Sequence, residues 1–224
     1  VLIQPPVYNI FYNSILNNGR RVLENKLVYE NGDYRMDFAD LEEKLSDPET
    51  SLMILCNPHN PVGKIWDKET LARVGELCKK YGVTVISDEI HSSVTRPGKS
   101  YLPFASVNEV CADISVTCVA ASKTFNLAGL QSAAVIAKNP ILRHRVWRGI
   151  NTDEVGEPNV FAMAANIAAY KYGDAFVDEV CEYIFENKRT AEEYIASKMP
   201  KLLPIKSDAT YLLWLDVSAY TDNS

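Results

Sequence analysis

Two short apolar runs separated by a single amphipathic stretch constrain the fold of this chain more than any other feature. The first run, 51–56, ends in a turn-rich loop at 57–63, and Asp67 then stands where a helix N-cap is expected. Apolar residues recur at the helical period as far as Gly82, a residue typical of helix ends, and a β-branched run follows at 83–87. This order of strand, helix and strand predicts a right-handed crossover between parallel strands.

The same alternation continues along the chain. It predicts an α/β fold with a mostly parallel sheet flanked by helices. The other expected elements are extended stretches within 20–36 around an Asn31-Gly32 turn, a helix at 38–45 capped by Asp37, strands at 115–120 and 132–137, helices near 140–150, 158–172 and 175–199, and strands at 202–205 and 210–216.

We predict two domains. Residues 1–174 form a large domain, and 175–224 begin a smaller α+β C-terminal domain with a long helix that bridges the two. The chain starts at Val1 without an initiator Met, in what reads as the interior of a strand. We therefore interpret it as a fragment of a longer protein.

Composition excludes several classes of function. The net charge of −6 argues against a nucleic-acid partner, and no apolar run reaches the roughly 18 residues of a membrane span. Five cysteines, an odd number without a C-x-x-C pair, indicate free thiols in a reducing cytoplasm. The three histidines lack metal-ligand spacing, so no metal site is expected.

Three polar residues follow the ends of three predicted strands: Asn60, Asp88 and Lys123. In open α/β sheets ligands bind in the crevice outside the carboxyl ends of the strands, so these residues are expected to converge on one pocket. A lysine amine forms a Schiff base with a carbonyl cofactor, and pyridoxal 5′-phosphate is the cofactor that most needs one. A carboxylate such as Asp88 would keep its ring nitrogen protonated.

Four segments resemble a known family: Asn-Pro-His-Asn-Pro-Val-Gly at 57–63, Ser-Asp-Glu-Ile-His at 87–91, the stretch Ala-Ser-Lys-Thr-Phe-Asn-Leu-Ala-Gly-Leu-Gln at 121–131, and Pro-Pro-Val-Tyr-Asn-Ile-Phe-Tyr at 5–12. They look like fold-type I pyridoxal-phosphate enzymes of the aminotransferase class I/II superfamily. They most resemble the MalY/PatB-type cystathionine β-lyases, which cleave carbon–sulfur bonds. The resemblance implies an aspartate aminotransferase-like large domain and a homodimer.

The resemblance also assigns roles to single residues. Lys123 would carry the cofactor as a Schiff base, Asp88 would pair with its ring nitrogen, and Asn60 would contact its phenolate oxygen. Tyr8 would stack on its ring, and Ser122 would help to bind its phosphate. His91 would also bind the cofactor, because it stands, as in the lyase group, where many aminotransferases have a tyrosine that contacts the phenolate. Ordinary structural readings stay open beside these: a surface lysine, a helix cap at Asp88, a turn at Asn60, a core aromatic at Tyr8 and a packed histidine at His91.

Two further parts of the family's site are not seen in this sequence. Gln131 replaces an arginine that many relatives use for the phosphate, so we expect that anchor on a helix N-terminus encoded before Val1. The arginine for the substrate carboxylate is expected beyond Ser224.

The implied reaction is α,β-elimination from an amino acid that carries sulfur on Cβ, such as cystathionine, to give a thiol, pyruvate and ammonia. Lys123 would remove the Cα proton as the general base. Two alternatives stay open: an aminotransferase that uses the same residues, and a regulatory protein that keeps the scaffold and contacts a protein partner.

Overall fold

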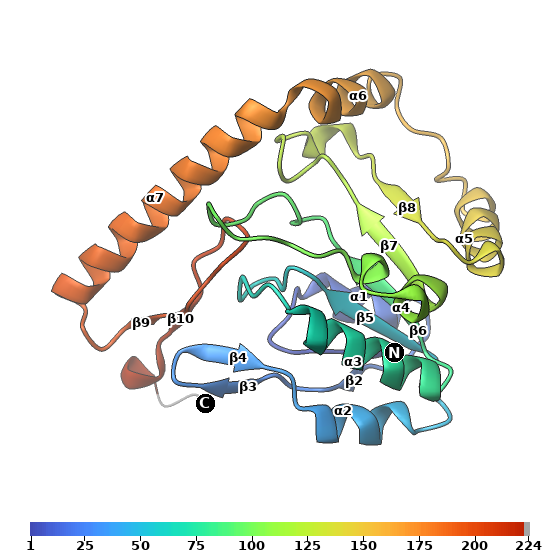
Figure 1. The fold of residues 1–224 in the computed structure, drawn as a ribbon, viewed down its shortest axis with the longest axis horizontal. Coiled ribbons are helices and arrows are strands. Elements are labelled where there is room, and N and C mark those ends of the chain that lie inside the picture. The colour runs from blue at the N-terminus through green and yellow to red at the C-terminus, as the bar shows by residue number, and fades with distance from the viewer. Residues whose placement is uncertain (222–224) are drawn as a thin grey trace.

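A six-stranded sheet forms the centre of the molecule in the computed structural model, which describes residues 1–221 (Figure 1). The strand order is β2-β1-β5-β6-β7-β8. The strands are β1 (Leu2–Ile3), β2 (Leu23–Glu24), β5 (Leu52–Cys56), β6 (Thr84–Asp88), β7 (Ser115–Val119) and β8 (Ala134–Ile136). All neighbours pair in parallel except β7 and β8. The predicted α/β class with a mostly parallel sheet is thus confirmed.

The crossover predicted from the apolar pattern is present as β5, α3 (Lys68–Lys80) and β6. Asp67 caps α3 as expected, because its carboxylate accepts a hydrogen bond from the Thr70 amide at 2.7 Å. Gly82 follows the helix with a φ of +70°, a conformation that glycine adopts without a steric penalty. These local signals fix where the helix begins and ends.

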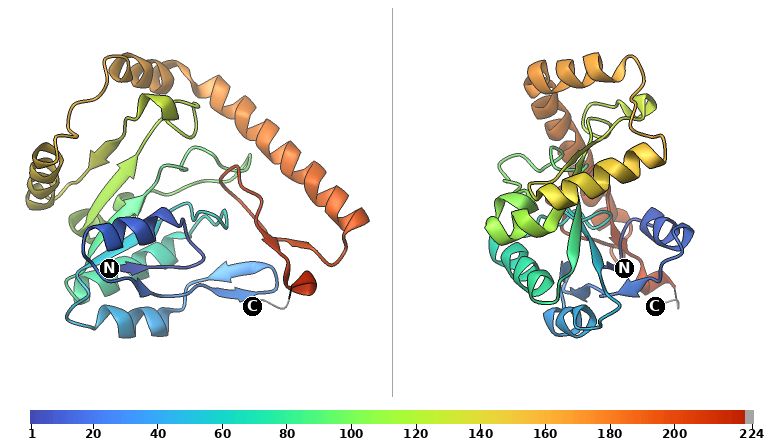
Figure 2. Two further views of the ribbon diagram at one scale, coloured as in Figure 1. Left: turned by 180° about the vertical axis from the view of Figure 1, so that it is seen from behind. Right: turned by 90° about the vertical axis from the view of Figure 1, so that its right-hand side faces the viewer.

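Helices cover both faces of the sheet, as the edge-on view in Figure 2 shows. The larger core packs α2 (Phe38–Leu45), α3 and α4 (Glu109–Ile114) against one face, and α1 (Ile10–Asn17) packs against the other in a smaller cluster. Asp37 caps α2 by accepting from the Ala39 and Asp40 amides. Neither α1 nor α4 was among the predicted elements.

The second half of the described chain adds α5 (Pro140–Thr152), α6 (Ala162–Tyr172) and α7 (Asp174–Lys198). Figure 1 shows α7 running alone along one side of the molecule, from α6 to the hairpin of β9 (Leu203–Pro204) and β10 (Leu215–Asp216). This hairpin is shorter than predicted. A second hairpin, β3 (Val28–Glu30) and β4 (Asp33–Arg35), turns at Asn31-Gly32 as the sequence predicts. The domain division after residue 174 stays a prediction.

Among the helices within residues 1–221, none is both long and apolar enough to cross a membrane.

Candidate functional site

The carboxyl ends of the central strands lie level with one another. Cys56, Asp88 and Cys118 are partners across β5, β6 and β7, so the loops that follow these three strands leave the sheet at one edge. Those loops carry Asn60, His91 and Lys123. The sheet register therefore brings together residues that span 63 positions of the sequence, from Asn60 to Lys123.

Asp88 is the last residue of β6 and is largely buried. Its carboxylate accepts a hydrogen bond from the Ile90 amide at 3.2 Å. Burial raises the pKa of Asp88, the neighbouring Glu89 raises it further, and the Ile90 amide and the Lys123 charge act in the opposite direction. Within residues 1–221 no basic group forms a salt bridge with it. The carboxylate therefore keeps acceptor capacity for a cationic N–H donor.

Lys123 lies in the turn that follows β7 and is half-buried. Its charge acts on both Asp88 and His91, which places the ammonium group near both side chains. In the described part of the chain its Nζ atom has no hydrogen bond or salt bridge, so the amine is not engaged in an ordinary structural role. Next to it, Ser122 accepts the Leu127 amide through its carbonyl oxygen at 3.1 Å, which holds the turn.

His91 is 2% exposed, and burial followed by the Lys123 charge lowers its pKa to about 4. The ring is therefore neutral near pH 7. Asn60 Nδ2 lies 3.3 Å from His91 Nε2, and because the amide nitrogen donates, Nε2 accepts and the ring proton sits on Nδ1. His91 Nδ1 is buried without a hydrogen-bond partner among the described residues. Such an unpaired group calls for an explanation.

Tyr8 lies before α1, in a segment held against the 57–63 loop because His59 Nε2 and the Pro6 carbonyl oxygen are 2.9 Å apart. Its ring meets Phe11 edge to face, with centroids 5.8 Å apart, and the residue is 39% exposed. Part of the ring is therefore open for stacking, although no contact joins it to Asp88 or Lys123 among the interactions of residues 1–221.

These groups fit pyridoxal phosphate in kind. A buried carboxylate with spare acceptor capacity suits a pyridinium N–H, an uncommitted lysine amine suits an aldehyde carbon, and the Asn60 amide suits a phenolate oxygen. No cluster of three metal-ligating side chains occurs in residues 1–221.

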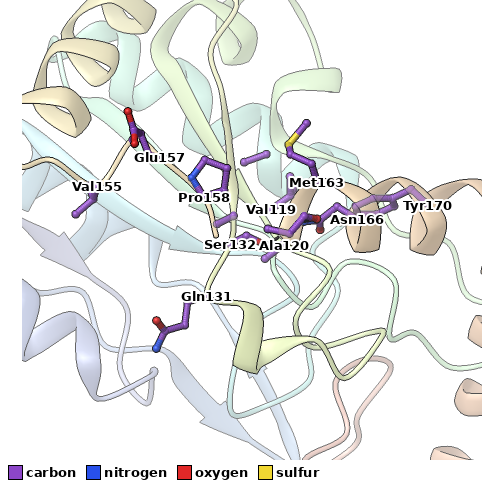
Figure 3. Close-up of a pocket in the computed structure, with 14 residues that line it drawn as sticks. Val119, Ala120, Gln131, Ser132, Val155, Glu157, Pro158, Met163, Asn166 and Tyr170 are labelled. Carbon is purple, nitrogen blue, oxygen red and sulfur yellow. Dashed lines mark hydrogen bonds between the residues drawn. The ribbon is translucent and has the colours of Figure 1, made fainter. Parts of the chain in front are cut away.

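A cavity of about 340 Å³ opens beside the end of β7. Figure 3 shows side chains from β7, α6 and the 155–158 segment around it, together with Gln131. Asn166 Nδ2 donates to Ser132 Oγ at 2.9 Å within this lining. The lining contains Glu157 and no lysine or arginine, so this cavity by itself does not suit a phosphate.

Two residues at this edge were not singled out from the sequence. Glu89 is buried beside Asp88 and accepts hydrogen bonds from Ser87 Oγ at 2.7 Å and from the Phe104 amide at 3.0 Å. Tyr211 meets the His91 ring edge to face with centroids 5.4 Å apart. Glu89 lies inside the recognised 87–91 motif, but Tyr211 is 120 positions from His91 and carries no local signal.

Comparison with known proteins gives consistent matches. The family model described as aminotransferase class I and II matches residues 1–224. The chain is 49% identical over 220 residues to cystathionine beta-lyase PatB of Bacillus subtilis (strain 168), covering 98% of this chain and 57% of PatB. It is 34% identical to protein MalY of Escherichia coli (strain K12), covering 97% of this chain and 55% of MalY.

Among solved structures, cystalysin from Treponema denticola superposes with a TM-score of 0.95 at 32% identity, covering 97% of this chain and 55% of cystalysin. That crystal structure contains pyridoxal 5′-phosphate. The chain thus spans a little over half the length of the relatives that it matches.

Proposed function

This chain belongs to the aminotransferase class I and II family, and we propose that the protein to which it belongs is a pyridoxal-phosphate-dependent carbon–sulfur lyase. The substrate would be cystathionine or a related S-substituted L-cysteine. The observation that carries the proposal is that Asp88, His91 and Lys123 lie together at one edge of the sheet. Among the described residues, the Asp88 carboxylate has no salt bridge, and His91 Nδ1 and the Lys123 amine have no hydrogen-bond partner. The similarity to PatB and MalY supports the choice of a lyase.

Each residue has a defined task in this proposal. When bound, the cofactor supplies an electron sink for the substrate carbanion. Asp88 pairs with the ring nitrogen and keeps it protonated, because an opposite charge nearby stabilises a cation. Lys123 holds the cofactor covalently until the substrate amine displaces it, and then takes the Cα proton as the general base. Asn60 donates a hydrogen bond to the phenolate oxygen, Tyr8 stacks on the ring, and Ser122 assists the phosphate.

His91 has a positioning task. Its neutral ring accepts from the Asn60 amide, which orients Asn60 toward the cofactor. After Lys123 has taken the Cα proton, the thiolate would leave Cβ and be released as a thiol. The remaining three-carbon fragment would take up water to give pyruvate and ammonia.

We also propose that the protein is a cytoplasmic homodimer. All five cysteines are free in the structure, as expected in a reducing compartment. The dimer rests on family membership.

The test is a product assay on the full-length protein with pyridoxal phosphate and cystathionine, without any added keto acid. Release of pyruvate and homocysteine in equal amounts supports the lyase. An aminotransferase, the second candidate on the same residues, would give turnover only with an added keto acid, and that result would replace the lyase proposal. Cystine and other S-substituted cysteines tested in parallel would identify the preferred leaving group.

A further inference from the structure

A lysine of α7 is buried where the C-terminal segment meets the site. Lys188 is 4% exposed, although lysine is seldom buried unless its charge is compensated. Its ammonium group donates to Ser207 Oγ at 2.9 Å, to the Ala209 carbonyl at 3.3 Å and to the Thr210 carbonyl at 2.8 Å. The ring of Phe185 lies 4.6 Å away. All three N–H donors are thus satisfied.

These contacts gather residues 207–210 into a tight turn. Ser207 Oγ also donates to the Ala209 carbonyl at 2.8 Å, and Thr210 has a φ of +62°, which is uncommon for a β-branched residue. Without Lys188 the Thr210 carbonyl would lose its buried donor and the Ala209 carbonyl would keep only Ser207 Oγ, and an unpaired buried polar group is unfavourable. Lys188 therefore holds the turn in this shape.

The 207–210 turn is hydrogen-bonded to the loop that carries Asn60. The amides of Asp208 and Ala209 both donate to the Gly63 carbonyl at 2.9 Å, and the Gly63 amide donates to the His59 carbonyl at 2.7 Å. A Cβ atom at Gly63 would lie 2.6 Å from the Ala209 carbonyl oxygen, so only glycine allows this approach. Asn60 lies between these two anchors at His59 and Gly63.

The same turn also holds the His91 side of the site. The Thr210 amide donates to the Val94 carbonyl at 2.8 Å, and the Arg96 amide donates to the Asp208 carbonyl at 2.8 Å. The residue after the turn is Tyr211, whose ring meets His91. Asn60 and His91, which contact each other, are therefore both tied to one turn.

We propose that Lys188 is a positioning residue: it fixes the 207–210 turn against Gly63 and Val94 and thereby sets the geometry of Asn60 and His91. The inference rests on the proposed function for its effect on the reaction. Its structural part, a link from α7 through the turn to the Asn60 loop, can be tested without substrate.

The first measurement is hydrogen exchange on the full-length protein. In Lys188→Met we expect the amides of 57–63 and 207–212 to exchange about tenfold faster or more, while β5 and β6 keep their protection. Lys198→Met, a change at an exposed lysine of the same helix, should leave both segments at the wild-type rate. If Lys188→Met does not fold, Ser207→Ala removes one acceptor and should give a smaller change in the same two segments.

The second measurement is kinetic. We expect Lys188→Met to lower kcat by about tenfold or more and to shift the visible absorbance of bound pyridoxal phosphate. The reason is that displacing the side chains that orient the reacting groups slows the reaction. Unchanged exchange in 57–63, equal acceleration across the whole protein, or local acceleration with an unchanged kcat would each overturn the proposal. A wild-type protein that releases no pyruvate would refute the lyase instead and would leave the exchange result standing.

Discussion

Replacing Gly63 by alanine tests the close contact between the Asn60 loop and the 207–210 turn. Gly63 has a φ of +76°, and an added Cβ would lie 2.6 Å from the Ala209 carbonyl oxygen and closer still to Ser207 Oγ. Neither atom is free to move, because Ser207 Oγ is held by Lys188 and the Ala209 carbonyl belongs to the turn itself. The Asn60 loop and the 207–210 turn must therefore move apart at this contact.

Two effects add to give the expected loss. A left-handed backbone conformation costs an alanine about 1–2 kcal/mol, and overpacking a closed contact costs about 1–3 kcal/mol. We therefore expect Gly63→Ala to lower the free energy of unfolding by about 2–5 kcal/mol. Activity should fall with it, since Asn60 lies in the displaced loop.

Urea unfolding of the full-length protein measures the first effect, with Gly82→Ala as the matched control. Gly82 has a similar φ of +70° but nothing within 4 Å of an added Cβ, so its substitution carries the backbone penalty alone. The entropy that alanine removes from the unfolded chain is common to both variants. If Gly63→Ala loses no more stability than Gly82→Ala, the proposed contact between the loop and the turn is not tight.

Three further predictions follow from the site and its family. Asp88→Asn should lower kcat on the order of a hundredfold, which corresponds to about 2.7 kcal/mol of activation free energy. The effect on cofactor affinity should be much smaller, and near-normal turnover would refute the electron-sink role. Burial lowers the pKa of His59 from 6.5 to about 4. Between these two pH values the unfolded chain binds more protons than the folded chain, so the free energy of unfolding falls as the pH falls. We expect His59→Gln to reduce the slope of the free energy of unfolding against pH by up to about 1.4 kcal/mol per pH unit, measured from urea midpoints, and an unchanged slope would show that His59 is not buried in the neutral form. Light scattering at micromolar concentration should report a homodimer, and a fully active monomer would contradict this.

Local sequence signals predicted the centre of the fold well. The apolar runs at 51–56 and 83–87, with Asp67 and Gly82 between them, predict β5, α3 and β6 within a residue or two because caps and periodicity act over a few positions. The convergence of Asn60, Asp88 and Lys123 at one edge of the sheet also follows, since the carboxyl ends of adjacent parallel strands lie at the same edge.

Other elements lacked such signals. No side-chain hydrogen bond caps α1 at its start, and two of its eight residues are asparagine, so tertiary packing of Phe11 and Ile15 decides that it is helical. The strand predicted at 210–216 shortens to β10, and its first residue, Thr210, belongs instead to the turn that Lys188 holds. Contacts of the 207–210 turn with Lys188, Gly63 and Val94 join distant parts of the chain, and no spacing rule predicts them.

The most direct test of the central claim is to find which lysine carries the cofactor. The full-length protein would be incubated with pyridoxal phosphate, reduced with borohydride, digested and mapped by mass spectrometry. We predict a pyridoxyl label on the peptide that contains Lys123, and its loss in Lys123→Ala. A label on Lys138 or on any other lysine, with Lys123 unmodified, would contradict the assignment of this sheet edge as the active site.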